Sequence, residues 1–312
     1  MRPCAPALST RPTDRKGIMS ATTEISRGTG APTRYRSIHR FRFKRDWTIS
    51  IVLGILGFIT FVPVIMLLEL SFKDDQQMAS AMWLPTLPLH VHNYVKAFAV
   101  MGSYLINSAV FVVGTVTVSI VCSTLTSYAF ARYPFPGREF FYLAVLALLM
   151  IPGILTLITC FVVTVSLKLN NTYLGVWLPL AAGSQAFQII VLRTFFASMP
   201  PELFEAGRID GASEARMLVS IAMPLAKPIL TTLIVLQING VWNEFIWPIM
   251  VLSRPERYPA ILAVLQLSTL ITARDVGAMY AGYVICGLPL FILFAFSSRA
   301  FIRGLTSGAI KM

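Results

Sequence analysis

Six long apolar stretches dominate this 312-residue chain. A helix needs about 20 consecutive apolar residues to cross the hydrocarbon core of a bilayer, and each stretch approaches or exceeds that length. They are Thr48–Leu70, Tyr104–Ala131, Phe140–Leu167, Leu174–Leu192, Ile229–Leu252 and Ala278–Phe296. Only 13% of the residues are charged, about half the share found in an average soluble domain. The sequence therefore predicts an all-α, polytopic membrane protein with six transmembrane helices.

The basic residues are distributed unevenly between the two sides of the predicted membrane domain. The net charge is +12, and 20 of the 26 Lys and Arg residues fall in the two termini and in alternate loops. Cytoplasmic loops carry an excess of Lys and Arg, so we expect both termini to be cytoplasmic. Topology and attraction to anionic membrane lipid account for the positive charge, and we expect no nucleic-acid partner.

Residues 1–46 differ in composition from the rest of the chain. They are rich in Ser, Thr, Pro and Arg and show almost no apolar periodicity, which is typical of disordered segments. We therefore expect a disordered basic cytoplasmic tail over residues 1–46 and a six-helix transmembrane domain over residues 47–312. Met19 offers a second possible start of translation besides Met1, and the sequence leaves that choice open.

Proline occurs in five of the six apolar stretches. Proline removes a backbone hydrogen bond and kinks a helix. The five residues are Pro63, Pro152, Pro179, Pro248 and Pro289. Kinked bundles suit proteins that change shape, which agrees with transport, but proline is also common in membrane helices generally.

Polar side chains interrupt the fourth and fifth stretches. Gln188 lies in the fourth, and Asn239, Asn243 and Glu244 lie in the fifth. Burying a charged side chain in lipid costs at least about 2.5 kcal/mol, so Glu244 should face protein or water. These four residues are candidates for the wall of a solute path. Hydrogen bonding between helices uses the same residue types and is the equal alternative.

Signals for metal binding and catalysis are weak. His90 and His92 lie in a predicted outer loop, and we interpret them as solvated rather than as metal ligands. The four cysteines form no C-x-x-C pair, and the chain has no G-x-x-x-x-G-K-[ST] phosphate loop. A membrane-embedded enzyme needs convergent nucleophiles, bases or metal ligands, so that class is disfavoured. We expect no catalytic residue, no cofactor and no bound metal.

The loop between the fourth and fifth stretches carries helix signals of its own. Pro200 and Pro201 suit a first turn, and Glu202 follows where the helix dipole favours an acidic residue. Gly211 is expected to end this helix. Positions with little side chain recur at helical spacing and offer a surface for close packing: Ala206, Gly207, Gly211 and Ala212. Such a helix either transmits movement to the flanking spans or only anchors the loop at the membrane surface.

A longer pattern runs through the same loop. Glu205-Ala206-Gly207 is followed after three residues by Gly211, and after nine more by Ile221-Ala222-Met223-Pro224. This spacing resembles the EAA loop of permease subunits of ATP-binding-cassette importers, with Gly207 in place of an alanine and Met223 in place of a leucine. The resemblance implies a coupling loop over residues 196–228. The residues it implies in contact with an ATPase subunit are Glu205, Ala206, Gly207, Asp210, Gly211 and Pro224.

Two further segments, Trp242–Pro248 and Phe301–Lys311, are similar to the carbohydrate branch of these importers, of which the maltose permease is the familiar member. The resemblance implies a non-enzymatic permease subunit of the bacterial inner membrane that forms half of the path for a sugar or oligosaccharide. The implied partners are a second homologous permease, two cytoplasmic ATP-binding subunits, which hydrolyse ATP, and an extracytoplasmic solute-binding protein. A glycerol phosphate or polyol cargo is the alternative. An anionic cargo would require basic groups along the path, and we see none well inside the spans.

Overall fold

The computed structural model describes residues 47–270 and 275–309, and every regular element within these ranges is helical. The predicted tail over residues 1–46 lies outside the described residues. The α-helices are α1 (Trp47–Leu70), α2 (Asp75–Ser80), α3 (His92–Arg132), α4 (Arg138–Leu148), α5 (Gly153–Ser166), α6 (Tyr173–Ala197), α7 (Pro201–Ile209), α8 (Glu214–Met217), α9 (Met223–Trp242), α10 (Ile246–Val251), α11 (Ala260–Leu270) and α12 (Val276–Ala309). A π-helical segment, η1 (Leu218–Ala222), joins α8 to α9, and a 3-10 turn, η2 (Pro255–Arg257), precedes α11. The all-α prediction is thus confirmed for the described residues.

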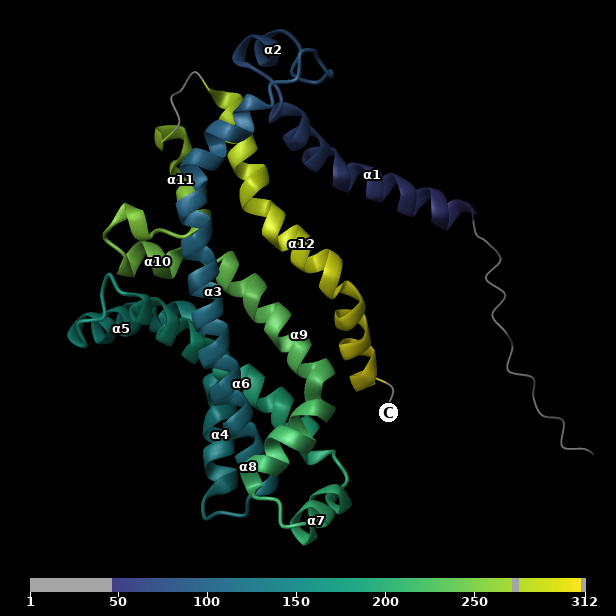
Figure 1. Cartoon of the computed structure of the whole chain (residues 1–312), viewed down its shortest axis with the longest axis vertical. Helices are drawn as coiled ribbons and strands as arrows, with labels where there is room; N and C mark the ends of the chain where they lie inside the picture. The colour runs from purple at the N-terminus through teal and green to yellow at the C-terminus, as the bar shows by residue number, and fades with distance from the viewer. Residues whose placement is uncertain (1–46, 271–274, 310–312) are drawn as a thin grey trace, which may run out of the picture. The chain divides into compact units, whose positions relative to one another are not determined.

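The chain divides into two compact units, residues 1–55 and residues 56–312. The described part of the first unit is the beginning of α1, whose described side chains are exposed. The second unit contains the remainder of α1 and all the other helices, including α3, α6, α9 and α12, which are seen in Figure 1. All the contacts discussed below lie within this second unit.

Five helical runs in the described residues are long and apolar enough to cross a membrane. They contain α1, α3, α6, α12 and the continuous segment Glu214–Trp242, which includes α9. The third predicted span is instead a bent pair, because α4 and α5 meet at an angle of 103°. The third apolar stretch, over Phe140–Leu167, is therefore two helices that meet at the expected proline kink, and a sixth span exists only if α4 and α5 together make one crossing.

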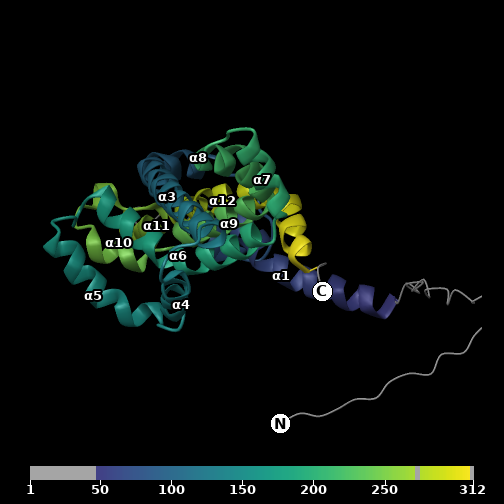
Figure 2. The same cartoon turned by 90° about the horizontal axis from the view of Figure 1, so that it is seen from below.

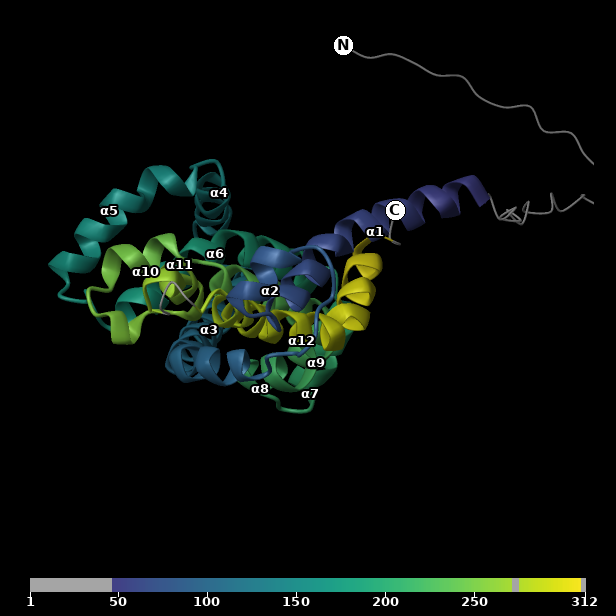
Figure 3. The same cartoon turned by 90° about the horizontal axis from the view of Figure 1, so that it is seen from above.

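The bend between α4 and α5 has a local cause. Pro152 precedes the first residue of α5 and cannot donate a backbone hydrogen bond, and its ψ of 126° takes the chain out of helical geometry. Figures 2 and 3 show α5 turning away from the direction of α4. Pro63, Pro179 and Pro289, by contrast, lie inside continuous helices. The fifth predicted span also ends early, since α9 stops at Trp242 and Pro248 belongs to the separate helix α10.

A compact lobe joins α1 to α3. The Lys73 side chain is buried: its Nζ lies 2.6 Å from Glu69 Oε1 and donates to the carbonyl oxygens of Ala81, Met82 and Leu84 at 2.7, 3.2 and 2.8 Å. This ion pair holds Glu69 against the lobe. Residues 93–98 form the first turns of α3, and the short helix of this loop is α2.

The spanning helices pack through small and polar side chains. Gly114 of α3 receives the ring of Trp177 from α6, and a Cβ added there would lie 2.1 Å from that ring. Ser119, Ser123 and Ser127 are fully buried on α3, at the spacing that places them on one helical face. Small residues let membrane helices approach closely, and hydroxyl groups then bond across the contact.

Candidate functional site

The loop between α6 and α9 contains a helix, α7, whose boundaries agree with the sequence signals. Pro200 occupies the N-cap and Pro201 the first helical position. The helix ends at Ile209, and Gly211 follows in the left-handed region with φ +75°. The Gly211 N–H donates to Arg208 O at 3.0 Å and the Ala212 N–H donates to Gly207 O at 2.9 Å, which is the hydrogen-bond pattern of a Schellman cap. Gly211 is therefore required by backbone conformation, because a Cβ there would have open space but a strained φ.

The α7 helix has a buried side and an exposed side. Phe204 is 2% exposed, and Gly207 lies on the same side, where a Cβ would come within 3.2 Å of Ile221 and 3.4 Å of Met217. Gly207 thus packs against the chain itself, and its expected contribution to a contact with an ATPase subunit stays a prediction. The outward side combines exposed carboxylates with exposed apolar groups. Its exposed residues are Glu202, Leu203, Glu205, Ala206, Ile209 and Asp210.

Arg132, at the end of α3, holds the base of the loop. Its Nη2 donates to the carbonyl oxygens of Phe196 and Met199 at 2.6 and 2.8 Å, and its guanidinium lies 4.0 Å from the centre of the Phe204 ring. Tyr128 packs edge-on against Phe196. These contacts join the ends of α3 and α6 to α7, so a displacement of α7 is transmitted to two spanning helices.

Glu214 forms a second tie at the base. Arg208 Nε and Nη2 donate to Glu214 Oε1 at 3.2 Å, and the Tyr128 hydroxyl lies 3.4 Å from Glu214 Oε2. Burial, and then the nearby Glu214 carboxylate, raise the pKa of Tyr133, which follows the end of α3. Sequence reasoning missed both Arg132 and Glu214, because their roles depend on contacts between segments distant in the chain.

The loop continues into α9 without interruption. Ser213 caps α8 by accepting from the Arg216 N–H, η1 follows as five π-helical residues, and Pro224 occupies the first turn of α9. Because η1 and α9 are continuous, the N–H that Pro224 lacks leaves a carbonyl of the preceding turn without its helical partner, and the π-helical segment lies directly before it. Short π segments are often found at functional sites.

The four candidate solute-path residues do not form one group in the structure. Gln188 is 2% exposed, accepts from Ser119 Oγ at 2.8 Å and donates through Nε2 to Gln237 Oε1 at 3.2 Å. It therefore bonds three helices together, and its place in a solute path stays a prediction. Asn239 and Asn243 are exposed, and Asn243 Nδ2 donates to Asn239 O at 2.8 Å. Asn239 borders a hollow of about 230 Å³ between α9 and α12.

Glu244 lines a different cavity, of about 480 Å³, between α5, α6, α9 and α10. Its Oε1 accepts from the Trp247 N–H at 2.9 Å, which fixes the start of α10. Gln237 and Ser184 line the same cavity. Gln237 was not singled out from the sequence. It lies on α9, whereas Glu244 follows the end of that helix at Trp242, so their shared cavity depends on the fold of the segment between α9 and α10.

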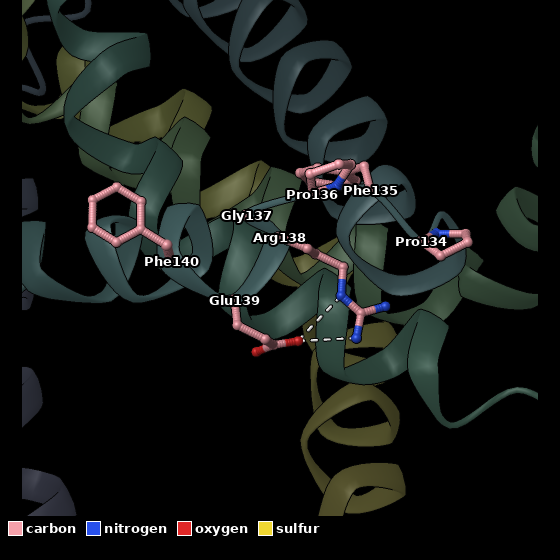
Figure 4. Close-up of a pocket in the computed structure, with 7 residues that line it drawn as sticks. All are labelled: Pro134, Phe135, Pro136, Gly137, Arg138, Glu139 and Phe140. Carbon is pink, nitrogen blue, oxygen red and sulfur yellow. Dashed lines mark hydrogen bonds and ion pairs between the residues drawn. The ribbon is translucent and has the colours of Figure 1, made fainter.

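A third hollow lies at the turn between α3 and α4. It measures about 600 Å³ and is lined by the consecutive residues 134–140. Figure 4 shows Arg138 directed at Glu139, whose Oε1 accepts from Arg138 Nε and Nη2 at 3.1 and 2.9 Å. Because this ion pair satisfies the charged groups of the hollow, we interpret it as the tight turn that its prolines and glycine predict. Across the residues that the structure describes, no group of three or more His, Cys, Asp or Glu residues could hold a metal ion.

The spanning helices and the loop anchored to their ends define a helical membrane protein. The family described as binding-protein-dependent transport system inner membrane component matches residues 119–307. The chain belongs to this family, and it is a multi-pass protein of the inner membrane.

Individual relatives agree with this assignment. The chain is similar to the arabinooligosaccharides transport system permease protein AraQ of Halalkalibacterium halodurans, with 33% identity over 85% of this chain and 96% of the relative. It is also 28% identical to the diacetylchitobiose uptake system permease protein NgcG of Streptomyces coelicolor, over 81% and 85% of the two chains. Its fold matches a chain in the crystal structure of a bacterial ABC transporter involved in the import of the acidic polysaccharide alginate. That match has a TM-score of 0.75 and 22% identity, and covers 83% of this chain and 98% of the other.

Proposed function

We propose that this chain is one of two permease subunits of an ATP-driven importer for a sugar or oligosaccharide. The observation that carries the proposal is α7, a helix anchored on one side and exposed on the other, in a loop between two spans. Relatives named for the transport of arabinooligosaccharides and of diacetylchitobiose support the sugar cargo. In this arrangement the chain crosses the membrane six times over residues 47–312, α4 and α5 make the third crossing together, and both termini are cytoplasmic.

The proposed partners follow from the separate roles of the subunits in such an importer. A second permease completes the path, and two cytoplasmic subunits bind and hydrolyse ATP. A solute-binding protein delivers the sugar from outside, as the name of the family requires. This chain then does no chemistry of its own: it receives motion at the loop over residues 196–228 and passes it to the spans.

The exposed side of α7 is proposed as the contact with an ATPase subunit. Ile209 is 86% exposed, and a large apolar side chain gains stability when a partner covers it. Glu205 and Asp210 beside it supply charge for orientation, and Ala206 permits close approach. Gly207 contributes from behind by seating α7 on Met217 and Ile221. Gly211 and Pro224 fix the two turns that connect this helix to the spans.

Co-purification in mild detergent tests the assembly. The tagged chain is expected to bring down a second permease and an ATPase, and a sugar-loaded binding protein is expected to raise ATP hydrolysis by the complex. Arabinotriose is the first sugar to try, followed by a panel of neutral oligosaccharides. A chain that purifies alone, with no ATPase and no stimulation by any sugar, contradicts the proposal.

Two substitutions of the same residue type test the contact. Ala206 and Ala215 are both exposed, on α7 and α8 respectively. Ala206→Glu is expected to lower the yield of co-purified ATPase at least tenfold, whereas Ala215→Glu retains it. Gly211→Val is expected to preserve membrane insertion while sugar-stimulated ATP hydrolysis is lost, because the strained turn shifts α7. Equal ATPase recovery with both alanine variants places the contact elsewhere.

A further inference from the structure

The cavity between α5, α6, α9 and α10 contains space that the packing of this chain does not explain. Gly183 on α6 and Gly240 on α9 line it, and a Cβ added at either would have no atom within 4 Å. Gly153, at the start of α5, lines it as well and is equally open. Glycine inside a helix costs about 0.5–1 kcal/mol relative to alanine. At Gly114 and Gly175 a neighbour only 2.1 Å from the added Cβ accounts for that cost, but at Gly183 and Gly240 nothing does.

Polar groups converge on this open space. Glu244 Oε1 is used by the Trp247 N–H, while no described residue bonds to Glu244 Oε2. Gln237 Oε1 accepts from Gln188, and within the described ranges its Nε2 donates to no protein group. The cavity thus presents a carboxylate oxygen that can accept a hydrogen bond and an amide that can donate one. Gln237 belongs to α9 and Glu244 to the link between α9 and α10, and their bonds to Gln188 and Trp247 hold them in place.

The lining also contains an aromatic ring and a thiol. Trp247 is 4% exposed and its Nε1 donates to Gly175 O at 2.9 Å, which fixes the indole at the cavity wall. Cys160 of α5 lies on the opposite helix of the lining. Ligand sites of about 300–1,000 Å³ with a few placed polar groups among apolar walls are typical for small molecules, and this cavity of about 480 Å³ falls in that range.

We propose that this cavity binds one ring of a neutral sugar as the sugar crosses the membrane. Sugar hydroxyls both donate and accept, so one ring can use Glu244 Oε2 and Gln237 Nε2 together, while Trp247 covers an apolar edge of the ring. Glu244 is the single charged residue of the lining, and it is acidic. A glycerol phosphate would meet repulsion here, because the lining has no basic group to offset Glu244.

The site rests on the proposed function and refines it. It assigns sugar contact to this chain and not only to the second permease. It replaces Gln188 with Gln237 as the cavity-facing amide and leaves Asn239 outside. With α9 running from the cytoplasmic loop outward, the cavity lies beside the outer end of α9, where a sugar released by an external binding protein would arrive first.

Labelling of Cys160 tests the site directly. The complex is prepared with Cys4, Cys122 and Cys286 replaced by serine, so that Cys160 is the single thiol of this chain. A charged, membrane-impermeant methanethiosulfonate is expected to react with Cys160 in the vanadate-trapped complex. The sugar that stimulates ATP hydrolysis is expected to slow this reaction at least tenfold, whereas glycerol 3-phosphate does not. A matched complex that retains only Cys122, which is exposed on α3 outside the cavity, is expected to show no sugar-dependent change.

Two pairs of substitutions test the site by measuring sugar uptake. Gly240→Leu fills the cavity and is expected to raise the sugar concentration for half-maximal uptake at least tenfold. Gly287→Leu, at a glycine of α12 with equally open surroundings, leaves uptake unchanged. Glu244→Gln retains the bond to Trp247. It is expected to raise the sugar concentration for half-maximal uptake about tenfold, because a hydrogen bond to a charged acceptor is stronger than one to a neutral acceptor. Glu256→Gln, at an exposed carboxylate of η2, serves as its control.

The outcomes separate this site from the function it rests on. If no sugar stimulates the purified complex, the sugar-importer proposal fails. If a sugar stimulates ATP hydrolysis but Cys160 is unreactive, lipid or a helix of the second permease fills the cavity and the site is overturned. Reactivity that the sugar does not slow overturns it as well.

Discussion

The base of α7 and the walls of the cavity differ in how closely their side chains approach one another. At the base, Phe204 is 2% exposed and a Cβ on Gly207 would come within 3.2 Å of a neighbour. In the cavity, Gly183 and Gly240 have no atom within 4 Å of an added Cβ. A close-packed interior transmits displacement because it cannot absorb it. The comparison indicates that this chain is closely packed where we propose that it receives motion and open where we propose that a sugar binds.

The largest expected effect comes from Arg132, which ties three segments together at the base. Arg132→Leu removes two charge-assisted hydrogen bonds and should lower the free energy of unfolding by about 3 kcal/mol. Thermal unfolding in detergent, followed by intrinsic fluorescence, measures the change. Arg216→Leu, at an exposed position of α8, is the control and should leave the midpoint unchanged. Equal midpoints for both variants would show that the base is not close-packed in solution.

A substitution at Gly207 tests how closely the buried side of α7 packs against the following turn. Gly207→Val places a branched side chain against Met217 and Ile221 and should cost about 2 kcal/mol. At Gly102 an added Cβ meets Phe98 only at 3.8 Å, so Gly102→Val is the matched comparison. The same unfolding measurement applies. A smaller loss at Gly207 than at Gly102 would contradict the orientation of α7 described above.

Gln188 probes the boundary between the two regions. Gln188→Leu leaves Ser119 and Gln237 each without one hydrogen bond and should cost about 1 kcal/mol. The sugar concentration for half-maximal uptake should also rise, because Gln237 loses the group that orients it. Gln76→Leu, at an exposed position of α2, is the control for both measurements. If the free energy of unfolding falls but the sugar concentration for half-maximal uptake is unchanged, Gln188 only joins helices.

The smallest effect, and one of opposite sign, is expected in the cavity wall. Gly183→Ala has room for the new methyl group and should stabilise the fold by about 0.5–1 kcal/mol through helix propensity. Gly114→Ala, where the methyl would overlap the Trp177 ring, should instead destabilise it. A destabilised Gly183→Ala variant would show that the cavity wall is as tight as the base and would remove the contrast between the two regions.

Much of the fold follows from apolar length, and the exceptions have physical reasons. Proline at position 152 predicted a kink in the stretch over residues 140–167, but hydropathy counts residues and not direction, so the angle of 103° could not be predicted. The boundaries of α7 were predictable because Pro201 and Gly211 act locally. The orientation of Gly207 was not, since it depends on Met217 and Ile221 from the following turn.

The solute-path residues stay predictions, and the structure places them differently from one another. Glu244 lines the cavity, Gln188 is buried and Asn239 borders another hollow. Gln237 lies on α9 and Glu244 lies beyond its end, so only the fold of the segment after Trp242 brings both to one cavity. Asn239 is two residues from Gln237 on α9 and therefore points elsewhere. That the loop contacts an ATPase and that the cavity holds a sugar remain predictions.

The lobe held by Lys73 has a consequence for how such proteins diverge. One ammonium group fixes the segment over residues 81–84 through backbone oxygens alone, and any amino acid supplies a backbone oxygen. The side chains of this segment and the one after it are correspondingly free, with Trp83 72% and Leu87 83% exposed. Substitutions there can change the outer surface without changing the scaffold beneath it. The shape of this lobe can therefore be inherited while its surface adapts to new external proteins.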